Sequence, residues 1–254
     1  MGTTHAAMGA AVTTTVAAVA HRVYGYDIGA AHLAAAAVTC AGAALLPDLD
    51  HPGSTAAHAL GPFTGFLARC TEWLSKVAYK LLRGPLDPPD AGAHRTLTHT
   101  LFTAAATGYG TWAAITAWGN AAALVTLFLC WTLAAYGLAG HRAHKAGTWI
   151  TAIAAALAVW AVLRWAPQAV PPPLVAWSVT AGCVVHLLGD VVTDHGIPAF
   201  WPLPLRGRRW WHLCLPGPLR ITTDGPVETK VVVPLCAVLT PVATWCALTS
   251  PFHH

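Results

Sequence analysis

Charged residues are what this sequence has least of. Only 24 of its 254 residues are Asp, Glu, Lys or Arg, a share of 9%, where a typical soluble domain has about 25%. A soluble protein of this length could not cover its surface with so few charges. The same scarcity, together with 56% hydrophobic residues, excludes an intrinsically disordered chain. The composition therefore indicates an integral membrane protein.

Paired cysteines are also missing. The chain has 7 Cys, none of them in a CxxC pair, and most lie inside apolar runs. This odd count and spacing do not predict a disulfide framework, so we interpret the cysteines as small buried hydrophobic side chains. The formal net charge of +4 is interpreted as a signal of membrane topology, and no nucleic-acid partner is expected.

Long apolar segments are what the sequence does contain. A membrane-spanning helix needs about 20 mostly apolar residues, and the windows that qualify predict an all-α, polytopic transmembrane helical bundle of six or seven spans. The first window is the weakest, because it is short and contains Thr. Residues 1–20 are alternatively a cleaved signal peptide, but Met1 to Ala7 has no Lys or Arg, which a signal peptide needs. The windows are 6–20, 28–46, 101–118, 121–139, 148–163, 174–192 and 231–249.

The few charges are sorted along the chain. If the connections alternate between two sides, one side receives the N-terminus, 47–100, 140–147 and 193–230. That side holds all Lys and Arg residues except Arg22 and Arg164, so the positive-inside rule makes it cytoplasmic. Nine of the ten acidic residues and ten of the fourteen His fall on or near the same side. The sequence thus predicts a multi-pass protein of the inner (plasma) membrane, with its polar groups facing the cytoplasm.

The longest connection contains an amphipathic segment. Apolar residues recur at helical spacing, with Arg69, Glu72, Lys76, Lys80 and Arg83 mostly between them. Such a helix suits the membrane interface, although an ordinary surface helix packed on the domain would show the same pattern. We therefore expect one membrane-embedded domain, 1–254, with 54–93 as a cytoplasmic interfacial insertion. The apolar residues are Phe63, Phe66, Leu67, Cys70, Trp73, Leu74, Val77 and Leu81.

Two short motifs flank this insertion. In Leu46-Pro-Asp-Leu-Asp-His51, Pro47 ends a helix, and in an extended chain Asp48 and Asp50 would point the same way, toward one metal or a metal pair. In His94-Arg-Thr-Leu-Thr-His99, Thr96 or Thr98 would cap the next helix. His94 and His99 could still converge if His94 precedes the helix, and Arg95 is a candidate anion clamp. Turn-forming and capping roles remain the alternative for these residues.

A third motif, His186-Leu-Leu-Gly-Asp190, closes a predicted span. His186 and Asp190 are four residues apart and so share one helix face, a spacing that can hold a divalent metal from one helix. Ionisable residues within a span are costly and indicate function, the alternative being a structural His–Asp pair. His5 is a weaker candidate at the same side. His and Asp without a surplus of thiols suit zinc, manganese or iron.

The ordered motifs resemble the YdjM-like family of inner-membrane metal-dependent hydrolases. The resemblance rests on LLPDLDH, HRTLTH, HLLGDVVTDHGIP followed by FWPL, and Thr4-His5-Ala6-Ala7-Met8-Gly9, and it covers residues 4 to about 230. That family is thought to be related to zinc-dependent phospholipases C and single-strand nucleases. This chain departs from it in the insertion between Gly53 and Ala93 and in Thr96, where a Gly is common.

The resemblance implies a divalent metal cofactor, most simply zinc, and a set of site residues. Asp50 and Arg95 would assist the ligands or act in catalysis, and Glu228 would join them. The implied ligands are His5, Asp48, His94, His99, His186 and Asp190.

Together these features predict a membrane-bound metal-dependent hydrolase, an enzyme that acts on a phosphoester such as a phospholipid or lipid-linked phosphate. Water activated at the metal would attack phosphorus, with Asp50 or Asp48 as base and Arg95 holding the phosphate. A metal-ion or proton transporter is the first alternative, disfavoured because transporters place ionisable groups near the midplane. A non-catalytic metal-binding scaffold is the second, and it would bind metal without turnover.

Overall fold

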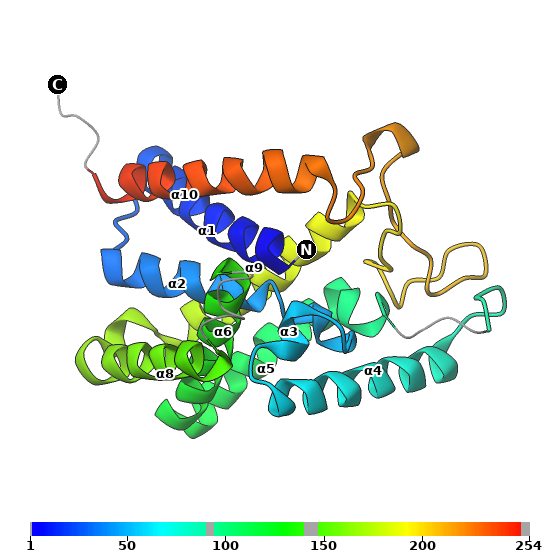
Figure 1. Ribbon diagram of the computed structural model, residues 1–254, viewed down its shortest axis with the longest axis horizontal. Helices are drawn as coiled ribbons and strands as arrows, with labels where there is room; N and C mark the ends of the chain where they lie inside the picture. Colours follow the sequence, from blue (N-terminus) through cyan, green and yellow to red (C-terminus); the bar gives the residue numbers. More distant parts are fainter. Residues whose placement is uncertain (1, 90–93, 140–146, 250–254) are drawn as a thin grey trace.

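The chain folds into helices joined by short turns and one long irregular segment (Figure 1). The structure is a computed structural model that describes residues 2–89, 94–139 and 147–249, and no β-strand occurs within these ranges. The long helices are α1 (Gly2–Tyr24), α2 (Ala30–Ala43), α4 (Pro62–Leu82), α5 (Leu101–Trp118), α6 (Asn120–Ala139), α8 (Thr148–Trp165), α9 (Pro172–Val191) and α10 (Val233–Leu248).

The all-α prediction is confirmed, and each expected span coincides with a helix. Five helical segments of the described chain are long and apolar enough to cross a membrane: Ala30–Asp50, Asn120–Ala139, Thr148–Trp165, Pro172–Val191 and Glu228–Leu248. Helices α1 and α5 are not among them, so a count of six or seven spans stays a prediction. Arg142 and Lys145, which entered the topology argument, lie outside the described residues.

Helices α2 and α9 form the inside of the bundle, because α2 packs against α1, α6 and α9 at once. Glycine makes the close approaches possible: a Cβ on Gly42 would collide with the backbone of Cys130, and one on Gly182 with the backbone of Cys40. Helix α8 packs on α6 and α10 packs on α1, and both are mostly exposed, whereas α2 and α9 are mostly buried. A polar group on α2 or α9 is therefore held in the protein interior.

Helix α4 carries the amphipathic pattern of the insertion and has three faces. Thr64, Ala68, Ser75 and Tyr79 are buried, so small and polar side chains make the packed face. The large apolar side chains Phe63, Phe66, Trp73, Leu74 and Leu81 are exposed, and the basic residues lie on the third face. The helix is confirmed, and its contact with a membrane surface stays a prediction.

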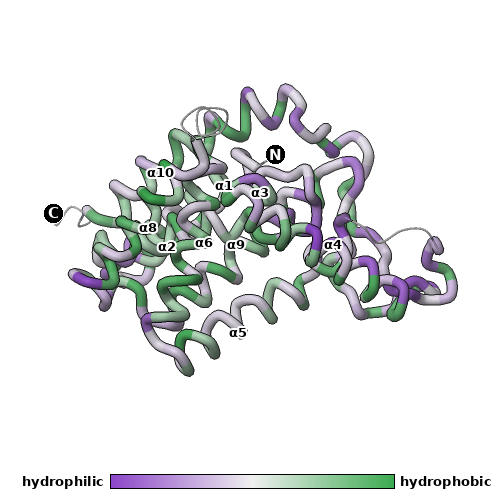
Figure 2. Tube along the Cα trace, turned by 60° about the horizontal axis from the view of Figure 1, so that its bottom comes forward, coloured by the Kyte–Doolittle hydropathy of each residue, from purple (hydrophilic) through white to green (hydrophobic). Residues whose placement is uncertain are grey.

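The end of α4 is fastened to the irregular segment 193–227. The Asp87 carboxylate accepts hydrogen bonds from the backbone N–H groups of Gly84, Arg209 and Trp210, and the Tyr79 ring lies 5.4 Å from that of Trp210. Hydrophilic residues gather around α4 and this segment, while the other long helices are largely hydrophobic (Figure 2). The insertion thus forms a polar end of the molecule, although residues 90–93 of the predicted 54–93 range lie outside the described chain.

Candidate metal centre

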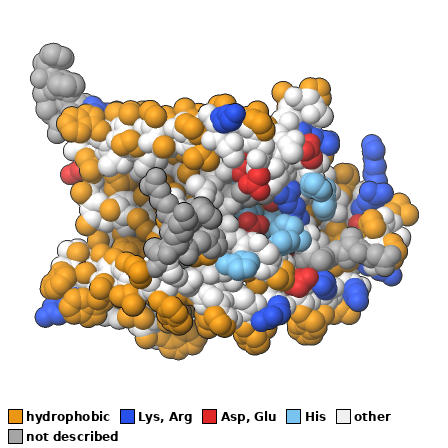
Figure 3. Space-filling view, viewed as in Figure 1, with side chains coloured by type: hydrophobic (Ala, Val, Ile, Leu, Met, Phe, Trp, Pro, Cys, Tyr) orange, Lys and Arg blue, Asp and Glu red, His pale blue; other side chains and the backbone are white. Residues whose placement is uncertain are grey.

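Three connections meet at the polar end of the bundle. They are the 3-10 turn η1 (Pro47–Asp50) after α2, the 3-10 turn η2 (Leu97–His99) before α5, and the last turns of α9. The first residues of α1 join them, since the His5 ring lies 4.0 Å from that of His186. In the space-filling view, His and acidic side chains gather in one region beside Lys and Arg (Figure 3). The sequence motifs therefore converge in space, as their common side predicted.

Four donor atoms face one another at the centre: His99 Nε2, His186 Nε2, Asp190 Oδ2 and Asp48 Oδ1. The two imidazole nitrogens are 3.1 Å apart. Asp190 Oδ2 lies 3.4 Å from His99 Nε2 and 3.6 Å from His186 Nε2. Asp48 Oδ1 lies 3.9 Å and 3.7 Å from the same two nitrogens.

These separations match a metal-binding site. Ligands about 2.0–2.1 Å from a tetrahedral zinc ion lie roughly 3.3 Å from one another, which falls among the five distances. Asp190 Oδ2 is buried and makes no hydrogen bond, although a buried polar atom is normally satisfied. Three sets of side chains in the described chain could each hold a metal ion, and the first of them is fully buried. They are His99 with His186 and Asp190, His5 with Asp48 and His186, and Asp48 with His94 and His99.

Hydrogen bonds orient His186. Its Nδ1 lies 2.8 Å from the carbonyl oxygen of Ala44, and because a carbonyl only accepts, Nδ1 carries the proton. Its other nitrogen, Nε2, faces the centre and is the atom available to a metal ion. A protein group that fixes the second nitrogen of a metal-binding His is a general feature of metal sites.

His99 carries a proton on both nitrogens in the metal-free protein. Thr98 Oγ1 donates to Asp50 Oδ2 and so accepts from His99 Nδ1 at 2.9 Å, while His99 Nε2 lies 3.1 Å from His186 Nε2. Burial lowers the pKa of His99, but the carboxylates of Asp190 and Asp50 outweigh it and raise the pKa to about 9. Metal binding at Nε2 must therefore displace a proton.

Asp50 is buried beside the four donors and accepts several hydrogen bonds. Its Oδ1 accepts from His94 Nδ1 at 2.7 Å, and its Oδ2 accepts from Thr98 and lies 3.5 Å from His99 Nδ1. The prediction that Asp48 and Asp50 point the same way is wrong. Pro47 begins a 3-10 turn rather than an extended segment, and in such a turn residues two apart face different directions, so only Asp48 faces the four-donor centre.

The structure also corrects the cap of α5. Neither Thr96 nor Thr98 caps this helix, since Thr100 is the N-cap and accepts from the Thr103 backbone N–H at 3.0 Å. The extra residues form η2, which turns His99 inward and leaves Thr98 to bond Asp50. His94 and His99 do converge, with ring centroids 5.1 Å apart, as the interpretation with His94 before the helix required.

Arg95 lies between these two histidines and points at α9. Its Nη1 donates to Thr193 Oγ1 at 2.7 Å and its Nη2 to Asp190 Oδ1 at 3.2 Å. Arg95 is buried, and its backbone is in the left-handed region with φ of 55°, which is strained for a residue with a Cβ. The predicted anion clamp therefore holds a carboxylate of the centre itself.

His5 and Glu228 lie together on the far side of Asp190. His5 Nε2 is 3.5 Å from Asp190 Oδ1, yet neither ring nitrogen of this buried side chain makes a hydrogen bond. Buried Glu228 accepts from Thr4 Oγ1 at 2.5 Å and from the Asp224 backbone N–H at 2.7 Å. Glu228 is in none of the three metal-capable sets of the described residues, and its part in catalysis stays a prediction.

Sequence reasoning missed the residues that orient the centre. Thr193 donates to the Asp190 carbonyl oxygen at 2.8 Å while accepting from Arg95, and Thr98 bonds Asp50. His212 also faces the centre: burial lowers its pKa, a hydrogen bond to the His195 carbonyl raises it, and nearby Arg95 and His99 lower it further. The threonines could have been suspected as the polar neighbours of candidate ligands, whereas nothing in the local sequence singles out His212.

The fold and this centre define a helical membrane protein with a buried His/Asp cluster able to hold a metal ion. The family model described as YdjM inner membrane protein matches residues 1–144 and 138–247. The chain therefore belongs to the YdjM inner membrane protein family, as the ordered motifs predicted. No curated protein and no solved structure matches the chain.

Proposed function

We propose that this protein is a membrane-bound, metal-dependent hydrolase that acts on a phosphoester such as a phospholipid or lipid-linked phosphate. The observation that carries the proposal is the four-donor centre, in which five of the six separations lie between 3.1 and 3.9 Å, close to the spacing of ligands around one small divalent ion. The tied Nδ1 of His186 and the hydrogen bond between Thr98 and Asp50 orient this centre before any ion binds. Zinc is the ion that such a nitrogen and oxygen set suits best.

The residues around the centre fit phosphoester hydrolysis. A divalent ion there would activate water and neutralise charge on a phosphoryl oxygen. Arg95 and Asp50 keep Asp190 and His99 in position. His94 is hydrogen-bonded through Nδ1, and its side chain is 33% exposed, so His94 is the group of the cluster best placed to pass a proton to or from solvent.

A cavity gives a substrate access to His94. It measures about 260 Å³ and is lined by His94, Thr96, Arg208, Trp211 and His212 among others. Arg208 supplies positive charge and the histidines supply ring nitrogens for hydrogen bonds, which suit a phosphate group. We place this opening at the cytoplasmic face, because all but two of the Lys and Arg residues fall on that side of the predicted topology.

Purification followed by elemental analysis and an assay against a panel of phosphoesters tests the proposal. We expect about one or two divalent ions per chain and metal-dependent turnover of at least one lipid phosphoester. His186→Ala should lose both metal and turnover, while His58→Ala, an exposed histidine in α3 (Thr55–His58), should keep both. Metal bound without turnover would favour a scaffold, and metal flux into liposomes without turnover would favour a transporter; either result overturns the hydrolase.

A further inference from the structure

Two cavities follow one seam of the bundle, the line along which α1 passes α9. The first, of about 140 Å³, lies directly beside the metal centre and is lined by His5, Met8, Leu188 and Val192 among others. The second, of about 250 Å³, lies farther from the centre on the same two helices. The lining residues of α9, from Leu174 to Val192, lie on one face of that helix, so both cavities open along the same side of it.

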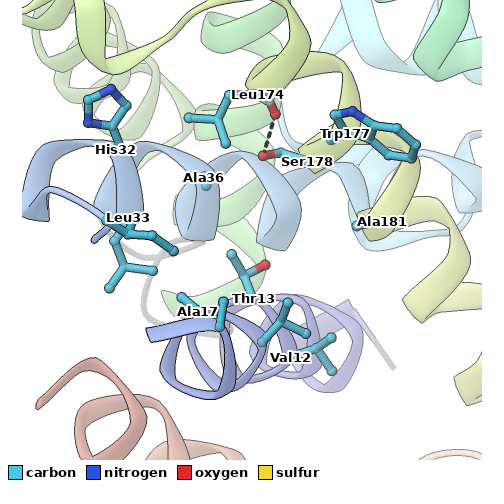
Figure 4. Close-up of a pocket in the computed structure, with 13 residues that line it drawn as sticks. Val12, Thr13, Ala17, His32, Leu33, Ala36, Leu174, Trp177, Ser178 and Ala181 are labelled. Carbon is cyan, nitrogen blue, oxygen red and sulfur yellow. Dashed lines mark hydrogen bonds between the residues drawn. The ribbon is translucent and has the colours of Figure 1, made fainter. Parts of the chain in front are cut away.

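The second cavity is mostly apolar, and the hydroxyl groups in its walls already donate hydrogen bonds to the backbone. Side chains of α1, α2 and α9 face it, with Val12, Leu33, Trp177 and Ala181 around its walls (Figure 4). Its hydroxyl groups have no proton left to donate to a ligand, because Ser178 Oγ donates to the Leu174 carbonyl at 2.8 Å, and Thr13 donates to the Gly9 carbonyl at 2.9 Å. His32 also lines the cavity, but most of its walls are apolar, so an occupant would be held mainly by apolar contact.

The first cavity has a different chemistry at its inner end. Both ring nitrogens of His5, which lines this cavity, lack hydrogen bonds although His5 is only 2% exposed. The remaining walls are mainly aliphatic. The seam therefore begins at the unsatisfied ring nitrogens of His5 beside the metal centre and continues into a largely apolar cavity.

The length of the seam suits a lipid. With a helical rise of about 1.5 Å per residue, the second cavity, from Val12 to Ala20, begins roughly 10 Å from His5 and ends about 22 Å from it. One leaflet of the hydrocarbon core is about 15 Å thick. A lipid whose phosphate lies at the metal centre would place the middle and end of one acyl chain at this distance.

We infer that the α1–α9 seam binds an acyl chain of the lipid whose headgroup lies at the metal centre. The inference deepens the proposed function and rests on it, because it names a lipid with at least one long chain as the substrate class. A helix from a second copy, about 10 Å across, would not enter a cavity of 250 Å³, whereas a single hydrocarbon chain would. The chain adds binding energy in proportion to the apolar area that it buries.

Photocrosslinking tests the seam without requiring turnover or metal. The protein is reconstituted in phosphatidylethanolamine/phosphatidylglycerol vesicles that contain a phosphatidylcholine with a diazirine in the middle of one acyl chain. After irradiation, we expect labelled peptides from α1 and α9 to exceed those from α8 and α10 several-fold. Equal labelling of all exposed helices would overturn the inference, since it would show ordinary lipid contact, and crosslinks between two copies through α1 or α9 would overturn it as well.

Variants that fill the cavity make the test specific. Ala181→Leu, and independently Val12→Phe at a more exposed position, should reduce the labelling of α1 and α9 at least threefold. The matched control is Ala154→Leu on exposed α8, which should change nothing. If both filled variants label like the wild type, the seam holds no chain and the inference is wrong.

Kinetics separates this inference from the proposed function. Ala181→Leu should lower kcat/KM for a long-chain lipid phosphoester about tenfold and leave kcat/KM for a water-soluble phosphoester unchanged. Specific labelling with no hydrolysis of any substrate would leave a lipid-binding seam and overturn the hydrolase. Hydrolysis with no preference for long chains would leave the hydrolase and overturn the seam.

Discussion

Helices α9 and α8 are alike in hydrophobic composition but differ in burial. Both are long apolar segments able to cross a membrane, but α9 is mostly buried and carries His186 and Asp190, whereas α8 is mostly exposed and contributes no residue to the metal-capable sets of the described chain. The same contrast separates α2, which leads into Asp48, from α10. Apolar composition therefore indicates which helices are able to cross a membrane, and packing decides which of them carries the His/Asp cluster.

The largest expected difference between α9 and α8 is in metal content, which a variant of the buried helix α9 should lose. Asp190→Ala removes a buried donor and leaves Arg95 without its carboxylate, so we expect metal content below one tenth of the wild-type value by elemental analysis. Thr151→Ala on α8, whose hydroxyl only bonds its own helix, is the control and should bind normally. Full metal content in Asp190→Ala would remove Asp190 from the ligand set.

Packing should show the next largest difference. Gly42→Ala places a methyl group against the backbone of Cys130, and overpacking typically costs about 1–3 kcal/mol or more. Gly110→Ala on α5, where a Cβ meets open space, should stabilise the helix by roughly 0.5–1 kcal/mol. Thermal unfolding in detergent, followed by circular dichroism, measures both, and equal melting temperatures would contradict the close approach of α2 and α6.

A substitution at Asp50 tests whether the donors need a carboxylate to orient them. Asp50→Asn keeps the size of the side chain but removes the charge that orients His94 and His99, so we expect metal affinity to fall about 10–100-fold. Isothermal titration with zinc measures the change. Asp224→Asn, an acidic residue outside the metal-capable sets, is the control, and an unchanged affinity in Asp50→Asn would mean that the two histidines need no orienting carboxylate.

The last of these effects is a pH dependence, which varies metal affinity without changing any residue. His99 is protonated at pH 7 because its pKa is raised to about 9, and a metal at Nε2 must displace that proton. Apparent zinc affinity should therefore rise with pH, by up to tenfold per unit below pH 9, and titrations at pH 6.5, 7.5 and 8.5 measure it. Proton release at pH 7.5, detected by buffers of different ionisation enthalpy, checks the cause, and affinity independent of pH would contradict it.

Much of this protein can be read from local sequence. The i, i+4 spacing of His186 and Asp190 fixes their common face as soon as that segment is helical, and each apolar run became a helix. The direction of Asp48 and Asp50 was predicted wrongly, because one 3-10 turn replaces an extended segment. The N-cap at Thr100 was missed for the same reason, since η2 inserts a turn before α5 that local pattern does not distinguish from the helix itself.

What the sequence by itself determined is the membrane, the helices and the family, because hydrophobicity and helical spacing are properties of neighbouring residues. The tertiary structure decided the site. Asp48, His99 and the pair His186 and Asp190 come from three separate parts of the chain, and their donor atoms meet because α2 and α9 pack closely through glycine in the interior. Likewise, His99 owes its second proton to Asp50 and Asp190, side chains that no pattern within ten residues of His99 could place beside it.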